Sequence, residues 1–231
     1  RALPLGAWEN RARLLARSAE CGTVPKIYNT ALTPCLPKKG MGSAPRDHRL
    51  LTIFSALYRV EAGAWYRHLL PWFTQDLDPD MFGGLAGKEP SEASWDAQSE
   101  LESAILANEN LVLMSLDYAK YFDSFDIQFT MDMLTHAGFP PHMIAWWRAV
   151  YAELERVVKI GRTLGEPWKP FNGIGQGDPL SLFPAILLVH WQFVMLRRTD
   201  DTLTMGAVID DRNVRGKLAA VLIAFDRIIA F

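Results

Sequence analysis

Two aspartates, Asp117 and Asp226, are the side chains whose surroundings best suit chemistry in this sequence. Each closes an apolar run typical of a β-strand, NLVLMSLD for the first and KLAAVLIAFD for the second. Carboxylate oxygens are the ligands that Mg²⁺ prefers, and a magnesium site keeps room for phosphate oxygens. Two carboxylates at neighbouring strand tips would therefore suit metal-assisted phosphoryl transfer. The alternative is that either aspartate only caps a turn.

Other familiar motifs fail when their spacing is checked. The string LAGKEP has Phe82 where a phosphate-binding P-loop needs its first glycine, and Glu89 where Ser or Thr must meet magnesium. The string GIGQG lacks the glycine spacing of a dinucleotide-binding turn. The five histidines show no metal-ligand spacing, so we interpret them as structural.

The composition is that of a globular protein, and the charges are distributed unevenly along the sequence. The 231 residues, 49% of them hydrophobic, allow one large domain or two small ones. The net charge of -2 argues by itself against nucleic-acid binding over the whole surface. However, residues 1–70 hold 11 Lys and Arg against 4 Asp and Glu, whereas residues 71–130 hold 2 against 12. This division suits a polyanion on one part and a cation on another, with ordinary solvated surface as the alternative.

Cellular context is indicated by the cysteines and the apolar runs. Only Cys21 and Cys35 are present, which fits a reducing intracellular compartment, nuclear or cytoplasmic. The longest apolar run, 184–196, is shorter than the roughly 20 residues of a membrane span, so no membrane partner is expected. The sequence starts without Met and stops inside an apolar stretch, so we expect a piece of a longer chain.

The residue pattern predicts helices and strands in mixed order, an α+β chain. Helices are expected at 7–20, 50–70, 91–108, 127–138 and 140–154, and from Pro179 onward after a glycine-rich loop at 173–177. Strands are expected in four places: an edge strand within 27–37 before a mobile basic turn at 38–40, a buried strand ending at Asp117, a hairpin over 156–172, and a hairpin over 217–231 with Asp226 in its turn.

Two strings in order, SLDYAKYFDSFD and NGIGQGDPLS, resemble core blocks of the reverse transcriptases of non-LTR retrotransposons. LPKKG, RLLTIFSALYRV and MFGGLAGKEPSEASWDA resemble the blocks before them, and LIAFDRIIAF occupies the place of the Y-A-D-D hairpin. The resemblance spans roughly residues 30–231. It implies a right-hand polymerase with an antiparallel palm sheet backed by helices. Residues 1–110 would be fingers-like and 111–231 the palm, with part of 124–172 returning to the fingers as an alternative and the thumb missing.

The resemblance also implies roles for individual residues. Asp117 and Asp226 would be the catalytic carboxylates that hold two Mg²⁺ ions, with Mn²⁺ as an alternative. The nucleotide-binding residues would be Lys39 and Arg49 at the triphosphate, Phe122 under the sugar as a barrier to a 2'-hydroxyl, and Gln176 and Gly177 along the nucleotide and template pocket.

The implied activity is RNA-directed DNA synthesis. Its partners would be an RNA template, a DNA primer and deoxynucleoside triphosphates, and flanking domains of a longer polyprotein are expected. Arg227 stands where the family has a second aspartate, and a positive charge there weakens cation binding. The first alternative is therefore an inactive nucleic-acid-binding module of the same fold. An RNA-templated RNA polymerase is disfavoured by Phe122, and an unrelated α+β domain is the last alternative.

Overall fold

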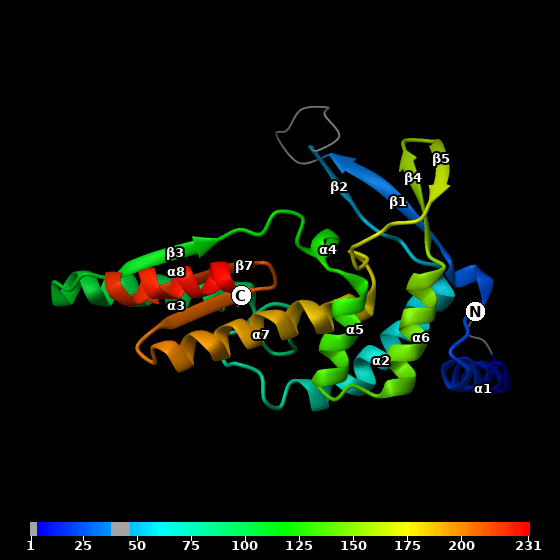
Figure 1. The fold of residues 1–231 in the computed structure, drawn as a ribbon, viewed down its shortest axis with the longest axis horizontal. Coiled ribbons are helices and arrows are strands. Elements are labelled where there is room, and N and C mark those ends of the chain that lie inside the picture. The colour runs from blue at the N-terminus through cyan, green and yellow to red at the C-terminus, as the bar shows by residue number, and fades with distance from the viewer. Residues whose placement is uncertain (1–3, 38–46) are drawn as a thin grey trace. The chain divides into compact units, whose positions relative to one another are not determined.

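The computed structural model describes residues 4–37 and 47–231, which form two compact units, each made of two chain segments (Figure 1). Unit 1 comprises 1–68 and 122–181, and unit 2 comprises 69–121 and 182–231. This division differs from a single boundary at residue 110, because 69–110 group with 182–231. The assignment of fingers and palm to particular residues stays a proposal. The expected basic turn at 38–40, with Lys39, lies outside the described residues.

Unit 1 contains a four-stranded sheet and several helices. Its elements are α1 (Leu5–Cys21), η1 (Lys26–Tyr28), β1 (Thr30–Pro37), β2 (His48–Leu50), α2 (Ala56–Phe73, whose residues 69–73 belong to unit 2), α4 (Tyr121–Ser124, whose first residue belongs to unit 2), α5 (Ile127–His136), α6 (Pro141–Ala152), β4 (Glu155–Ile160), β5 (Thr163–Trp168) and η3 (Pro179–Ser181). The strand order is β2-β1-β4-β5, with β1 antiparallel to β2 and parallel to β4. The expected hairpin over 156–172 is present as β4 and β5, joined at Gly161, but β5 ends at Trp168 and leaves 169–172 outside it.

The prediction that β1 is an edge strand is wrong, because β1 lies between β2 and β4. Its prolines suggested an edge, since proline donates no backbone hydrogen bond. In the structure Pro34 forms the last pair with β4 and Pro37 the last pair with β2. Both prolines therefore stand at the ends of ladders, where a missing donor interrupts nothing.

Helix α2 begins six residues later than the predicted start at residue 50, because residues 51–55 are held in an extended form. Ile53 and Leu32 exchange backbone hydrogen bonds of 2.7 and 2.9 Å, and the Thr52 N–H donates to the Gln176 carbonyl at 3.0 Å. These bonds satisfy backbone groups that a helix would otherwise use. The predicted helices at 127–138 and 140–154 are confirmed, and the Asp126 carboxylate caps the first by accepting from the Phe129 N–H at 2.7 Å.

Unit 2 contains a three-stranded antiparallel sheet backed by helices. Its elements are α3 (Pro90–Ala107), β3 (Val112–Leu116), α7 (Leu182–Thr199), β6 (Thr204–Val208), β7 (Asp211–Gly216) and α8 (Leu218–Ala230). The strand order is β3-β7-β6; α3 packs on β6, and α8 packs on β3 and β7. The predicted fold class, a mixed chain with an antiparallel sheet backed by helices, is confirmed.

Two predictions about the strands of this unit are wrong. β3 was expected to be buried, but it is the edge strand and its side chains alternate between half-buried and exposed. Residues 217–231 were expected to form a hairpin, but they form helix α8. The hairpin of the unit is β6 and β7, which the residue pattern did not predict.

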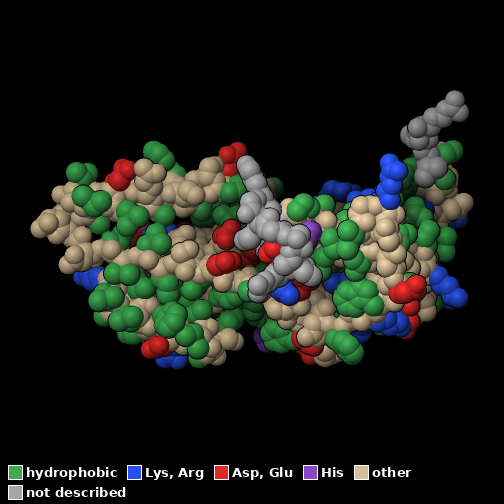
Figure 2. Space-filling model, turned by 90° about the horizontal axis from the view of Figure 1, so that it is seen from above, with side chains coloured by type: hydrophobic (Ala, Val, Ile, Leu, Met, Phe, Trp, Pro, Cys, Tyr) green, Lys and Arg blue, Asp and Glu red, His purple; other side chains and the backbone are tan. Residues whose placement is uncertain are grey.

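Helix α8 buries a narrow stripe and exposes much of its apolar surface. Ala220, Val221 and Ala224 recur at helical spacing and form the buried stripe. Exposed positions on the same helix include Leu218, Leu222, Ile223, Phe225 and Ile229. Figure 2 shows many hydrophobic side chains on the surface that unit 2 forms (green, left). Apolar runs of this length suit a strand as well as a helix, which explains the wrong prediction.

The helical stretch Pro179–Thr199 is long and apolar enough to cross a membrane by length and composition alone. Most of this stretch is buried inside the protein, as in a core helix. The buried Gln192 in its interior is paired, since its amide accepts from Arg212 at 2.7 Å and donates to the Tyr118 hydroxyl at 3.1 Å. Burial by protein therefore accounts for its apolar composition.

Candidate functional site

Asp117 lies directly after β3, as the apolar run NLVLMSL predicts, and its side chain is exposed. The last pair of the β3–β7 ladder joins Leu116 to Arg212. One step further along the same register brings Asp117 level with Asp211, the first residue of β7. Residues opposite each other in an antiparallel pair point to the same face, with Cβ atoms about 5 Å apart. The end of this sheet therefore carries at least two neighbouring carboxylates.

The β6–β7 turn adds a third acidic residue near this end. Its two turn residues are Ile209, whose φ is 59°, and Asp210. Asp210 and Asp211 were missed from the sequence because residues 204–216 were not predicted as a hairpin. The available signal was the Asp-Asp pair, a turn-forming dipeptide after the largely apolar run TMGAVI.

Asp226 is exposed on α8 and not in a hairpin turn. The helix starts just after Gly216, which pairs with Val112 at the opposite end of β3 from Asp117. From there α8 runs alongside β3 toward the end where that strand stops (Figure 1). At 1.5 Å per residue Asp226 is carried about 12 Å along the helix, and Asp117 lies about 17 Å along the strand from Val112. Asp226 is thus carried toward the same end of the sheet.

These carboxylates suit magnesium by their chemistry. Among the described residues, no three His, Cys, Asp or Glu side chains form a group that could enclose a metal ion. Magnesium, however, keeps several waters and is commonly held by one or two carboxylates together with substrate phosphates. Exposed carboxylates at a strand end supply such a partial ligand set. Arg227, next to Asp226, is also exposed and adds a positive charge to α8.

In unit 1 the glycine-rich loop is held by the segments that carry other predicted site residues. The Ile174 N–H donates to the Phe122 carbonyl at 2.9 Å, which ties the loop to α4. On its other side the Gln176 carbonyl accepts from Thr52, three residues after Arg49. Phe122 is half-buried, whereas Arg49 and Gln176 are exposed. The structure thus brings Phe122, Gln176 and the segment following Arg49 around one loop.

Glycine is required at two positions of this loop. At Gly175 a Cβ would lie 2.5 Å from the Phe54 ring, and at Gly177 it would lie 2.6 Å from the Thr52 carbonyl oxygen. Gly177 also has a φ of 129°, a conformation that other residues rarely adopt. The backbone of the loop therefore packs closely against residues 52–54. A Cβ at either position would push the loop away from residues 52–54.

Asp178, in the same GQGDPLS string, is a buried carboxylate inside unit 1. Its Oδ2 accepts hydrogen bonds from the Tyr58 hydroxyl at 2.7 Å, Trp147 Nε1 at 2.8 Å and the Tyr151 hydroxyl at 2.9 Å. Its Oδ1 accepts from the Leu180 N–H at 3.0 Å. Burial raises the pKa of Asp178, and these hydrogen bonds counteract part of that rise. Asp178 was not among the predicted site residues.

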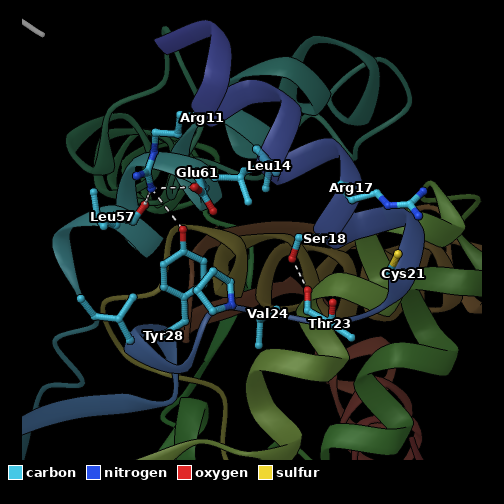
Figure 3. Close-up of a pocket in the computed structure, with 13 residues that line it drawn as sticks. Arg11, Leu14, Arg17, Ser18, Cys21, Thr23, Val24, Tyr28, Leu57 and Glu61 are labelled. Atoms are coloured by element: carbon cyan, nitrogen blue, oxygen red, sulfur yellow. Dashed lines mark hydrogen bonds and ion pairs between the residues drawn. The ribbon is translucent and has the colours of Figure 1, made fainter. Parts of the chain in front are cut away.

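A separate cavity of about 430 Å³ lies in unit 1 beside α1 and the start of α2 (Figure 3). Arg11 points toward Glu61 and Tyr28 at one end of it, and its Nη2 donates to the Glu61 carboxylate at 2.6 Å and the Tyr28 hydroxyl at 3.1 Å. Burial is the main cause that raises the pKa of Glu61. None of its lining residues is a predicted site residue. The cluster ties α1 to α2.

No family model matches the chain. The chain is 26% identical over 208 residues to the "Transposon TX1 uncharacterized 149 kDa protein" of Xenopus laevis, a match that covers 86% of this chain and 16% of that protein. It is 26% identical over 191 residues to the "Retrovirus-related Pol polyprotein from type-1 retrotransposable element R2" of Nasonia vitripennis, covering 80% of this chain and 18% of that protein. The chain therefore spans under a fifth of the length of these curated relatives.

Solved structures with a similar fold include telomerases. Apo telomerase from Candida tropicalis, truncated from its C-terminal domain, matches with a TM-score of 0.64 at 11% identity, over 96% of this chain and 51% of that chain. Telomerase from Candida albicans in complex with a TWJ fragment of telomeric RNA matches with a TM-score of 0.61 at 12% identity, over 99% of this chain and 44% of that chain.

The chain shares its fold with these telomerases over nearly its whole length, which fits the predicted fold of a polymerase's fingers and palm. The predicted resemblance to the reverse transcriptase domain of non-LTR retrotransposons is confirmed by the two transposon relatives together with this fold.

Proposed function

We propose that this chain is the template-copying core of an RNA-directed DNA polymerase, which adds deoxynucleotides to a primer 3'-hydroxyl. The observation that carries the proposal is the position of Asp117, an exposed carboxylate at the tip of a strand in an antiparallel sheet. The order of SLDYAKYFDSFD and NGIGQGDPLS and the likeness to retrotransposon proteins support it. The partners are an RNA template, a DNA primer and deoxynucleoside triphosphates, inside the cell and within a longer polyprotein.

The proposed roles follow from the chemistry of each side chain. Asp117 and Asp226 are the catalytic residues and hold two Mg²⁺ ions, for which Mn²⁺ can substitute. The bound metal supplies positive charge at the reacting phosphate and lowers the pKa of the attacking hydroxyl. Arg49, with Lys39, neutralises the triphosphate.

In the same proposal, the exposed residues Gln176 and Gly177 face the base pair that forms. The absent Cβ of Gly177 allows the loop to pack against the Thr52 carbonyl, which fixes the position of both residues.

The proposal is tested by primer extension with the full-length protein that contains this chain, on an RNA template with Mg²⁺. We expect slow extension, because Arg227 weakens cation binding near Asp226, and we expect Arg227→Asp to accelerate extension by about tenfold or more. Omission of the metal and a DNA-free control define the background. Lack of extension by both proteins would contradict the proposal.

Arg227 favours a second candidate function, an inactive module that binds nucleic acid without copying it. This candidate predicts that the natural protein retains a labelled RNA–DNA hybrid and does not extend its primer. Such binding would be salt-dependent, because contacts to phosphates release counterions. Extension by the natural protein excludes this candidate.

Phe122 is proposed to exclude ribonucleotides by its bulk. We expect Phe122→Ala to raise the efficiency of ribonucleotide relative to deoxynucleotide incorporation by roughly tenfold or more, because space opens for the 2'-hydroxyl. The measurement is the ratio of the two kcat/KM values in single-nucleotide addition. Phe129→Ala is the matched control, since Phe129 is an exposed phenylalanine of the same unit. An unchanged ratio would remove the steric role.

A further inference from the structure

We propose that Tyr151 is a positioning residue that fixes the loop carrying Gln176 and Gly177. Its hydroxyl donates to the buried Asp178 carboxylate at 2.9 Å and accepts from the Gly175 N–H at 2.8 Å. A single hydroxyl thereby links a buried charge to the backbone of the loop. The inference rests on the proposed function for the role of the loop, but the link itself is a feature of unit 1 alone.

The link depends on the burial of its members. Asp178 is 4% exposed and Tyr151 is 8% exposed, so water competes little for their hydrogen bonds. A carboxylate removed from water is stabilised only by strong hydrogen bonds to its charge, and three side chains supply them here. The donors resist rotation, because each lost hydrogen bond would leave the buried carboxylate poorly compensated. The Tyr151 hydroxyl is consequently held in one orientation.

Tyr151 differs from the other two donors in the hydrogen bond that its hydroxyl oxygen accepts. Tyr58 and Trp147 also donate to Asp178. Within the described part of the chain, neither of them forms a hydrogen bond with the backbone of residues 173–177. A hydroxyl can donate one hydrogen bond and accept others, and Tyr151 uses both capacities. Removal of its oxygen therefore breaks the link, whereas removal of the Tyr58 oxygen leaves it intact.

The opposite side of the loop is fixed by packing and by a backbone bond. Gly175 lies against the Phe54 ring with no room for a Cβ, and the Gln176 carbonyl accepts from Thr52. Gly175 is thus held between an aromatic ring and the Tyr151 hydroxyl. Without the hydroxyl, the buried Gly175 N–H would lack a partner, and the loop would shift to regain one from water. Gln176 and Gly177 are the next two residues and would shift with it.

The test compares Tyr151→Phe with Tyr58→Phe in the full-length protein, or in its Arg227→Asp variant if that is needed for measurable extension. Each variant deletes one hydroxyl donor to Asp178, and both tyrosines are buried, so the general cost of weakening the carboxylate network is matched. We expect Tyr151→Phe to raise KM for the deoxynucleoside triphosphate by roughly tenfold with kcat changed less than about threefold. Tyr58→Phe should raise KM by less than about threefold.

Amide hydrogen exchange provides a readout that does not need activity. Tyr151→Phe should increase exchange within 173–177 relative to Tyr58→Phe, while exchange in α5 and α6 stays equal in the two variants. Greater exchange in a protein that never extends a primer would support the positioning role and contradict the proposed function. Equal exchange at 173–177 in the two variants, or equal KM changes, would overturn the positioning role even if extension is robust.

Discussion

Asp117→Asn is expected to abolish primer extension, with kcat/KM at least about a hundredfold lower. The amide keeps the size of the side chain and removes the negative charge that would hold Mg²⁺ at the tip of β3. A hundredfold loss corresponds to about 2.7 kcal/mol of transition-state stabilisation, a modest demand for a lost ionic ligand. Because the Asp117 side chain is exposed, the substitution should leave the thermal unfolding midpoint nearly unchanged.

Asp201→Asn is the matched control for this variant. Asp201 is an exposed aspartate of the same unit, but it precedes β6 and therefore lies near the end of the sheet away from the β6–β7 turn. It loses the same charge without affecting the end that carries Asp117. Extension by Asp117→Asn at more than a third of the natural rate would show that Asp117 holds no essential metal. Equal losses in the two variants would indicate a general effect of charge.

The features that could be predicted from sequence are those encoded within one segment. The strand before Asp117 follows from its unbroken apolar run, and α3 follows from Pro90 at its first residue and from the acidic face beyond it. The glycine-rich loop before α7 likewise follows from Gly173 to Gly177. Each of these signals depends on neighbouring residues in the chain, so distant parts of the protein do not change it.

The features that could not be predicted depend on partners far away in the sequence. Nothing local tells whether β3 is central or at an edge, because that depends on β7, about 100 residues later. The helical state of α8 depends on the packing of Ala220, Val221 and Ala224 against β3 and β7. Its composition of Ala, Leu and Ile satisfies both kinds of element, and tertiary contact decides between them.

The role of Asp178 shows the same limit within the candidate site. The sequence places it beside Gln176 and Gly177 but does not show that it is buried. Its donors Tyr58, Trp147 and Tyr151 come from α2 and α6, 27 to 120 residues away. A charged residue in a motif next to glycine would ordinarily be interpreted as exposed. Only the assembled unit reveals that this carboxylate faces inward.

The second carboxylate is tested by comparing Asp226→Asn with Asp211→Asn. We expect Asp226→Asn to lower extension at least about a hundredfold, because Asp226 follows GQGDPLS in the order of the family motifs and α8 carries it toward the end of β3. We expect Asp211→Asn to lower extension less than about threefold. Asp211 lies one step beyond the last β3–β7 pair, as Asp117 does, but it stands outside the order of the family motifs, so we expect no essential ligand role for it.

The measurement for both variants is kcat/KM for single-nucleotide addition across a range of Mg²⁺ concentrations. A lost metal ligand should raise the Mg²⁺ concentration needed for half-maximal rate, whereas a folding defect should lower the rate at every concentration. The reverse result, with Asp211→Asn inactive and Asp226→Asn near the natural rate, would assign the second ligand to the β6–β7 turn. In that case Arg227 would no longer stand beside the metal, and the gain expected from Arg227→Asp would disappear with it.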